Sequence, residues 1–448
     1  MKLTWRDKLF YGTGNLGYST ISATLSNFIM FFGTSILGVS GTLIGIAVSI
    51  SVFWDAISDP VVGYYSDNST SVLGKRHPFI LIGILGMCAV NLLVWLIPAS
   101  ASEIVKFIWL LFSLISIQSF CTLFATPYLA LGLDMTNSPH EQTSLQCTKT
   151  IFFLFGMMLP TVFMFVFMPS GSGQGQLVAK GYADIAYASS IICLIFGLIT
   201  FFGTLKWNMK YICNNNQIVK KEKLSSVFND FFKILKKRKY RNIILGYAVS
   251  LVAATILTGA GLHMFTYCFH FNSQQIAITM GSLLVGAMVS QFFWSMVSKR
   301  IGKKMALIRG LSIGIIGIIF MWGIFITRDL MTTDLLMLVT FPIIFICGFG
   351  TGVLYSFPIS IFSDIMAEDK ELVGKSKYGT YSSITTLTYK MSDAFSLFLI
   401  GVVLDVIKFS SASPVQPLSV QNGLGLFVIL GMIIALGASI LIYNNYDK

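Results

Sequence analysis

Residues 63–79 read GYYSDNSTSVLGKRHPF and form a short polar stretch between two long apolar runs. A related stretch, WSMVSKRIGKKMAL, occupies residues 294–307, again between apolar runs. The tripeptide Gly-Lys-Arg at 74–76 matches Gly-Lys-Lys at 302–304, and the two copies lie 228 residues apart (302 − 74). The match predicts equivalent loops in two halves of one chain.

A second pair of stretches has nearly the same spacing. LGLDMTNSPHEQTSL at 131–145 resembles SIFSDIMAEDKELVG at 360–374, so that Asp134 matches Asp364, 230 residues later (364 − 134). The first pair follows the second and eighth apolar runs, and the second pair follows the fourth and tenth. Two loop pairs at nearly one separation predict a duplicated bundle of six helices.

The composition identifies a protein whose main solvent is not water. The chain has 448 residues, of which 55% are hydrophobic and 11% charged, and its mean hydropathy is +0.76. These values exclude an ordinary soluble globular protein. Because a helix needs about 20 apolar residues to cross a hydrocarbon core of roughly 30 Å, we predict an all-α membrane protein with twelve transmembrane helices. The predicted spans are 9–37, 43–65, 78–97, 105–133, 150–167, 184–205, 243–271, 276–297, 305–326, 335–361, 378–407 and 424–443.

The basic residues indicate membrane topology and not a nucleic-acid partner, despite a net charge of +12. Of the 31 Lys and Arg residues, 26 lie on one side of the predicted spans, four on the other side and one inside a span. Positive charge concentrates on the cytoplasmic side of membrane proteins. We therefore expect a multi-pass protein of the plasma (inner) membrane with both termini in the cytoplasm.

The predicted domain organisation has three parts. Residues 1–205 form one six-helix bundle and residues 242–448 form the other, joined by a basic linker at 206–241. Within the linker, KKEKLSSVFNDFFKILKKRKYR (220–241) repeats apolar residues at helical intervals between lysines. This pattern predicts an amphipathic helix on the anionic lipids of the inner leaflet. A docking site for a regulatory partner is the alternative interpretation.

The most informative residues are acids inside a predicted span, because a charge at the bilayer centre costs at least about 2.5 kcal/mol. Asp55 and Asp59 are four residues apart in FWDAISDPVVGYYSD (53–67) and share one helix face. Two adjacent carboxylates repel each other unless a cation or a proton lies between them. Ser58, Thr122 and the carbonyl that Pro60 frees from the helix are further oxygen donors. This set predicts a site for Na⁺, Li⁺ or H⁺, and simple pairing with a basic residue is the alternative.

Two basic residues, one deep in a predicted span and one at the start of another, are candidates for solute binding or coupling. Lys390 lies deep in a span, three residues before Asp393, so the two are either a neutralised structural pair or part of a solute cavity. Lys149 lies near the start of the fifth span, where its side chain either snorkels to the interface or enters the cavity.

Several polar and aromatic residues inside the spans are possible solute contacts. The principal candidates are Tyr18, Ser19, Tyr128 and His263. For each of them, a hydrogen-bonded role in the packed core is the competing interpretation.

Six stretches carry a resemblance to a known family. They are KLFYGTGNLG (8–17), FWDAISDPVVGYYSD (53–67), GKRHPFIL (74–81), ATPYLALGLDMT (125–136), HEQTSL (140–145) and SIFSDIMAEDKELVGKSKYGTYSS (360–383). Together they resemble the glycoside-pentoside-hexuronide:cation symporters, the melibiose-permease-like family of the major facilitator superfamily. The resemblance implies two pseudo-symmetric six-helix bundles with a solute site between them at the bilayer midplane. It also implies Na⁺, Li⁺ or H⁺ at Asp55 and Asp59, helped by Ser58 and Thr122. Lys149 and Lys390 are then expected in the cavity.

The chain differs from the melibiose branch at the residues with which that branch binds a galactoside. The acid of the first helix is replaced by Ser19, the acid of the fourth by Ala125, and the tryptophan one turn later by Leu129. Ser58 stands where that branch has asparagine. The resemblance thus implies the cation site more strongly than it implies recognition of galactosides.

The function predicted from these features is cation-coupled symport of a small polar solute, with a sugar or glycoside the first choice. The alternatives are an uncoupled facilitator or exchanger, a symporter for a non-sugar or lipid-like solute, and a sensor that has lost transport. The sequence contains no H-E-x-x-H, G-x-S-x-G or P-loop motif, so neither an enzyme nor an ATP-driven pump is expected. The seven scattered cysteines indicate no disulfide framework or metal site. We expect no cofactor beyond the coupling cation, no partners beyond solute and membrane lipids, and a monomer.

Overall fold

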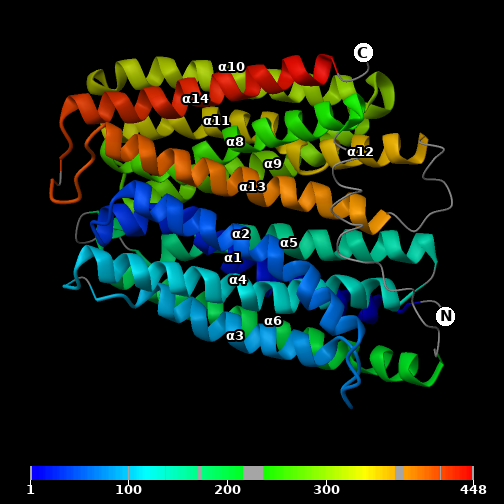
Figure 1. Ribbon diagram of the computed structural model, residues 1–448. Coiled ribbons are helices and arrows are strands. Elements are labelled where there is room, and N and C mark those ends of the chain that lie inside the picture. The colour runs from blue at the N-terminus through cyan, green and yellow to red at the C-terminus, as the bar shows by residue number, and fades with distance from the viewer. Residues whose placement is uncertain are drawn as a thin grey trace. The chain divides into compact units, whose positions relative to one another are not determined.

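The chain folds into long helices that cluster into two compact units (Figure 1). The computed structural model describes residues 3–98, 100–136, 138–168, 174–214, 236–368, 378–413 and 415–445, and contains no strand within these ranges. Unit 1 comprises residues 1–39, 46–171 and 175–220. Unit 2 comprises residues 40–45, 172–174 and 221–448.

Unit 1 is built from six long helices. They are α1 (Trp5–Phe31), α2 (Gly41–Asp67), α3 (His77–Trp95), α4 (Glu103–Asp134), α5 (Pro139–Phe167) and α6 (Ala179–Asn214). The π-helical turn η1 (Phe32–Ile36) continues α1, and the 3-10 turn η3 (Gly175–Leu177) precedes α6. The first residues of α2 group with unit 2. Within unit 1, α1 packs against α5 and α6, and α3 packs against α4 and α6.

Unit 2 repeats this arrangement. Its helices are α8 (Arg238–Tyr267), α9 (Ser273–Ile301), α10 (Lys303–Thr327), α11 (Thr333–Thr351), α12 (Phe357–Glu368), α13 (Tyr378–Val406) and α14 (Leu418–Asn444). The 3-10 turns η4 (Arg328–Leu330) and η5 (Gly352–Tyr355) follow α10 and α11. Here α8 packs against α13 and α14, and α10 packs against α11 and α14. These four helix pairings match those of unit 1, whereas the close pairing of α9 with α11 has no equally close counterpart between α2 and α4.

The repeated loops make equivalent contacts in the two units. Gly74 and Gly302 both adopt positive φ angles, 87° and 82°, a conformation that a side chain disfavours. In unit 1, Nε of Arg76 lies 3.2 Å from a carboxylate oxygen of Asp134. In unit 2, Nζ of Lys303 lies 2.6 Å from a carboxylate oxygen of Asp364. In each unit a basic residue of the loop after the second helix thus pairs with the matching acid, Asp134 or Asp364, although Arg76 corresponds in sequence to Lys304 and not to Lys303.

Eleven helices in the described part of the chain are long and apolar enough to span a membrane. The eleven do not include α1, although its 27 residues are long enough for the first predicted span. Polar side chains of α1, including Asn15, Thr20 and Thr24, are buried against protein. Because these groups never meet lipid, α1 tolerates a composition that would be costly on the outside of the fold.

The predicted tenth span, 335–361, is confirmed by one candidate membrane span, Thr333–Ile365, within which the helix type changes. α11 ends at Thr351, η5 follows, and α12 starts at Phe357. Pro358, in the first turn of α12, has no N–H group and so cannot continue the backbone hydrogen bonds of the preceding helix. At Gly352, an added Cβ would lie 2.8 Å from the backbone of Ala287, so the chain passes α9 too closely for a larger residue.

The predicted linker helix lies mostly outside the described residues, at 215–235. The described part of the linker shows that α6 extends to Asn214 and that α8 begins at Arg238. Both helices therefore continue beyond the predicted ends of their spans, residues 205 and 243.

Candidate functional site

Two carboxylates of α2 lie one helical turn apart. Asp55 is only 2% exposed, whereas Asp59 is half-buried. α2 continues from Gly41 to Asp67 with Pro60 inside it, so the two acids keep the four-residue spacing that places them on one face. A carboxylate buried to this extent needs hydrogen-bond donors or a cation to remain ionised.

Hydroxyl groups predicted to assist the acids lie beside Asp55. The Thr122 hydroxyl of α4 donates to Oδ1 of Asp55 at 2.6 Å. The hydroxyls of Ser58 and Thr122 are 3.1 Å apart, and Ser58 donates to the backbone carbonyl of Asp55 at 3.1 Å. Two helices thus bring together the four residues singled out as the cation site: Asp55, Ser58, Asp59 and Thr122. That they bind a cation stays a prediction.

Thr126 is a residue of this site that the sequence interpretation missed. Its hydroxyl, also on α4, donates to Oδ1 of Asp59 at 3.3 Å. The pairs Asp55 with Thr122 and Asp59 with Thr126 both span 67 residues. A repeated four-residue spacing on two helices was therefore the available signal.

The donor set favours a small hard cation. It consists of two carboxylates and the hydroxyls of Ser58, Thr122 and Thr126, all oxygen. In the described part of the chain, no group of three or more His, Cys, Asp or Glu side chains is arranged to hold a metal ion. Oxygen donors suit hard ions and a carboxylate pair suits a proton, so the residues fit the Na⁺, Li⁺ or H⁺ expected from the sequence.

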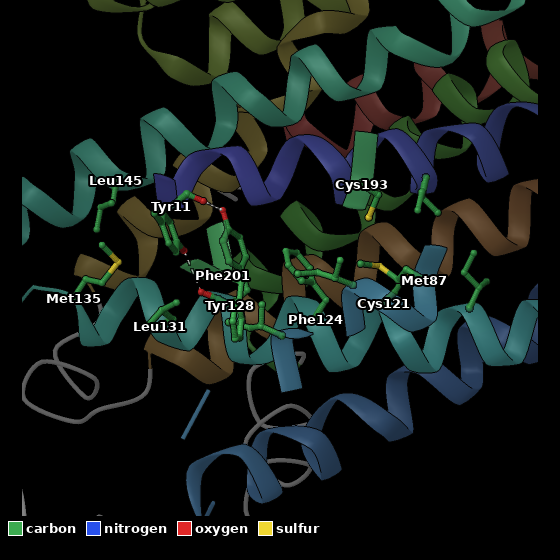
Figure 2. Packing of buried hydrophobic residues seen from close by; sticks show 14 of the residues in the cluster. Tyr11, Met87, Cys121, Phe124, Tyr128, Leu131, Met135, Leu145, Cys193 and Phe201 are labelled. Carbon is green, nitrogen blue, oxygen red and sulfur yellow. Dashed lines mark hydrogen bonds between the residues drawn. The ribbon is translucent and has the colours of Figure 1, made fainter. Parts of the chain in front are cut away.

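A stack of aromatic rings joins α1 and α4 in unit 1 (Figure 2). The rings of Tyr11 and Tyr128 are 4.6 Å apart, and Phe124 stacks on Tyr128 at 5.0 Å. Tyr11 and Tyr128 each donate a hydroxyl hydrogen bond to the other's backbone carbonyl, at 3.3 and 2.7 Å. Tyr128 is only 1% exposed, so its position favours the packing role over solute contact. Tyr18 is more exposed, stacks on Phe124 at 6.0 Å and lies within electrostatic range of Asp55.

Ser19 and Lys149 have different surroundings. Ser19 is 1% exposed, donates to the Leu16 carbonyl at 3.1 Å and lies against Gly156 of α5, which favours packing. Because α5 begins at Pro139, Lys149 lies well inside the helix and not at its start. Its Nζ is 5.9 Å from the centre of the Tyr128 ring, within the range of a cation–π interaction.

The candidates of unit 2 lie on α8 and α13. Lys390 and Asp393 are both half-buried on α13, and Thr255 of α8 donates to Asp393 at 3.0 Å. His263 of α8 is fully buried, and its ring meets Phe409 edge-on at 5.6 Å. Burial of this kind favours a core role for His263, whereas Lys390 and Asp393 are less enclosed.

The chain matches the family described as MFS/sugar transport protein over residues 10–447, almost its whole length. The chain belongs to this family. It is a multi-pass membrane transporter of the major facilitator superfamily and not an enzyme, and its resemblance to the glycoside-pentoside-hexuronide:cation symporters is confirmed at the level of the family.

Similar proteins of known sequence include transporters of bacteria and vertebrates. The uncharacterized symporter sll1374 of Synechocystis is 22% identical over 96% of this chain and 90% of that protein. The putative glycoside/cation symporter YagG of Escherichia coli is 22% identical over 98% of this chain and 92% of that protein. The mouse sodium-dependent lysophosphatidylcholine symporter 1 is 22% identical over 98% of this chain and 85% of that protein.

Solved structures support the fold. A D-xylose–proton symporter has a TM-score of 0.66 at 13% identity, covering 96% of this chain and 97% of the other. A bacterial homologue of the iron transporter ferroportin, in the inward-facing state, also has a TM-score of 0.66, at 12% identity over the full length of both chains. At such low identity these likenesses show a shared fold and nothing about the solute.

Proposed function

We propose that this transporter couples movement of a small polar solute to a cation bound at Asp55 and Asp59. The observation that carries the proposal is the burial of Asp55, 2% exposed, with a hydroxyl donor at 2.6 Å and a second carboxylate one turn away. The names of relatives, a glycoside/cation symporter and a sodium-dependent symporter among them, support the same activity.

The mechanism follows from the cost of burying charge. Without a cation, two carboxylates in a low-dielectric region repel each other, so any conformation that encloses them is unfavourable. Na⁺, Li⁺ or H⁺ offsets that charge and favours the enclosed state. If solute binding favours the same state, each ligand raises the affinity of the other by the same factor, which is coupling in the thermodynamic sense. An inward membrane potential adds about 2.3 kcal/mol per charge per 100 mV for a charge that crosses the whole field.

The solute is proposed to be a sugar or glycoside, as the family description suggests. Candidate contacts are Tyr18, Lys149, Lys390 and Asp393, whereas the packed positions of Ser19, Tyr128 and His263 make them weaker candidates. Simple galactosides such as melibiose should bind poorly, since Ala125 and Leu129 replace the residues that grip them in the related branch. A lipid-like solute is the alternative, supported by the lysophosphatidylcholine symporters among the relatives.

Uptake into proteoliposomes tests the cation half of the proposal. A thermal-shift screen with and without Na⁺ first identifies the solute, because ligand binding raises the melting temperature. Imposed Na⁺, Li⁺ or proton gradients should then drive uptake in the wild type. Asp55→Asn and Asp59→Asn should each abolish coupled uptake and remain folded in detergent, because a neutral side chain is easier to bury. Normal gradient-driven uptake by both variants, or gradient-independent uptake by the wild type, would favour the uncoupled facilitator or exchanger.

The membrane setting is part of the proposal. The positive-inside asymmetry supports cytoplasmic termini, and the proposal includes a monomer whose partners are solute and membrane lipids. Tags at each terminus that are accessible only from the cytoplasmic side would agree with this orientation, and tags accessible from outside would reverse it.

A further inference from the structure

Thr126 repeats, one turn further along both helices, the contact that Thr122 makes. Thr122 donates to Asp55 and Thr126 donates to Asp59, and each pair spans 67 residues. Because positions four apart share a helix face, the second pair extends the first along the same α2 and α4 faces. Each acid of the pair therefore has its own threonine.

We propose that Thr126 is an oxygen ligand of the coupling cation and that its hydroxyl sets how tightly the site holds Na⁺ or Li⁺. This inference rests on the proposed function of Asp55 and Asp59. It adds to that function a residue that determines specificity and that the sequence pattern alone did not identify.

The hydroxyl chemistry of Thr126 suits this role. A threonine hydroxyl has one proton to donate and two lone pairs, so it can donate to Asp59 and still offer an oxygen lone pair to an ion. The contact with Asp59 is 3.3 Å, longer than the usual range of about 2.5–3.0 Å for such bonds. The corresponding bond of Thr122 is 2.6 Å. The Thr126 hydroxyl therefore makes a weaker hydrogen bond than the Thr122 hydroxyl. Turning it toward an ion costs less hydrogen-bond energy than turning the Thr122 hydroxyl would.

The other branch of the Thr126 side chain is positioned by packing. A Cβ added to Gly63 would lie 3.5 Å from Cγ2 of Thr126, so this methyl group faces Gly63, one turn beyond Asp59 on α2. A β-branched side chain is stiff about χ1. With the methyl over Gly63, the hydroxyl is held toward Asp59. Valine at position 126 would keep the methyl contact and remove only the oxygen.

Calorimetric titration of Na⁺ and Li⁺ into the purified full chain tests the assignment. Thr126→Val should weaken Na⁺ binding about tenfold or more, because it removes one of the protein oxygens that would contact the ion. Thr126→Ser keeps the hydroxyl and should bind Na⁺ within about threefold of the wild type. The melting temperature without cation should be nearly the same in all three proteins. Ser119→Ala is the matched control, because this α4 hydroxyl accepts from Trp54 at 2.8 Å and donates to the carbonyl of Ile115 instead of to an acid.

The possible outcomes separate this inference from the proposed function. Unchanged Na⁺ affinity in Thr126→Val, with binding lost in Asp59→Asn, would overturn the role of Thr126 and leave the cation site standing. A loss that Thr126→Ser does not rescue would assign Thr126 to packing and also overturn it. Absence of Na⁺ and Li⁺ binding in the wild type would refute the metal-ion site and this inference together. If Thr126→Val does not fold, Thr126→Ala takes its place and the same criteria apply.

Discussion

The hydrogen bond between Thr122 and Asp55 should show a measurable coupling energy in a double-mutant cycle. Neutral hydrogen bonds between membrane helices average about 0.6 kcal/mol, and bonds to an ionised acceptor are roughly twice as strong. At 2.6 Å this bond lies in the short range expected for a hydroxyl donating to a carboxylate, and both side chains are at most 2% exposed. We therefore expect a coupling of about 1–2 kcal/mol.

The cycle compares the wild type, Thr122→Val, Asp55→Ala and the double variant. The free energy of unfolding is measured by denaturant titration in mixed micelles free of Na⁺ and Li⁺, so that no bound metal ion contributes. The double variant should be less destabilised than the sum of the single variants by the coupling energy. As a control, Ser119→Ala with Asp55→Ala should be additive within about 0.5 kcal/mol, because Ser119 bonds to Trp54 instead. A coupling below about 0.5 kcal/mol for Thr122 and Asp55 would refute the view that the hydroxyl stabilises an ionised carboxylate.

Three further predictions concern other charged groups. Arg76→Ala should lower the free energy of unfolding by about 1–3 kcal/mol in denaturant titrations, because the Arg76 side chain is 10% exposed and bonds to three partners. Lys303→Ala should lower it by less than about 1 kcal/mol, because the Lys303 side chain is 41% exposed. Equal losses in the two variants would contradict this ranking. Asp7 precedes the first predicted span, and although burial would raise its pKa, hydrogen bonds from Lys206 and Thr4 outweigh burial and lower the pKa below 3.8. The ionised Asp7 therefore stabilises the fold above pH 3.8, and this stabilisation is lost as the pH falls through the lowered pKa. Asp7→Asn lacks this effect, so its melting temperature should fall less than the wild-type melting temperature when the pH is lowered below 3.8. Lys390→Ala should weaken the Na⁺ dependence of solute affinity more than Lys149→Ala does, because Lys390 lies three residues from the acid Asp393 and Lys149 lies over an aromatic ring; calorimetry of solute binding across a Na⁺ series would detect the opposite order.

Sequence patterns predicted the parts of the fold that depend on composition and spacing. Loop pairs at nearly constant separation predicted the duplication, and in each unit a basic loop residue contacts the matching acid, Arg76 with Asp134 and Lys303 with Asp364. Helix ends were predicted less well, because hydropathy records where lipid begins and not where hydrogen bonding stops. The break at Gly352 depends on how closely α9 approaches, which no local pattern of hydropathy encodes.

The candidate site divides in a similar way. An acid in a membrane span is conspicuous in a sequence because it is costly, so Asp55 and Asp59 were identified directly. Threonine carries no such signal, because its hydroxyl can bond to the carbonyl of its own helix anywhere in a span, as Thr24 does at 2.8 Å. Thr126 could be distinguished from such residues only after α4 was placed beside α2. The packed state of Ser19 and Tyr128 likewise depends on neighbours far away in the sequence.

The two acids of α2 are chemically similar but differ in burial and in hydrogen bonding, and this difference suggests separate roles in cation binding. Asp55 is 2% exposed and accepts a short hydrogen bond from Thr122, a bond that favours the ionised form. Asp59 is half-buried and accepts a longer contact from Thr126. Of two carboxylates that share a site, the more exposed one meets an incoming cation first. Asp55 thus has the geometry of a fixed negative charge, and Asp59, with Thr126 beside it, has the geometry of the group that changes when the cation arrives.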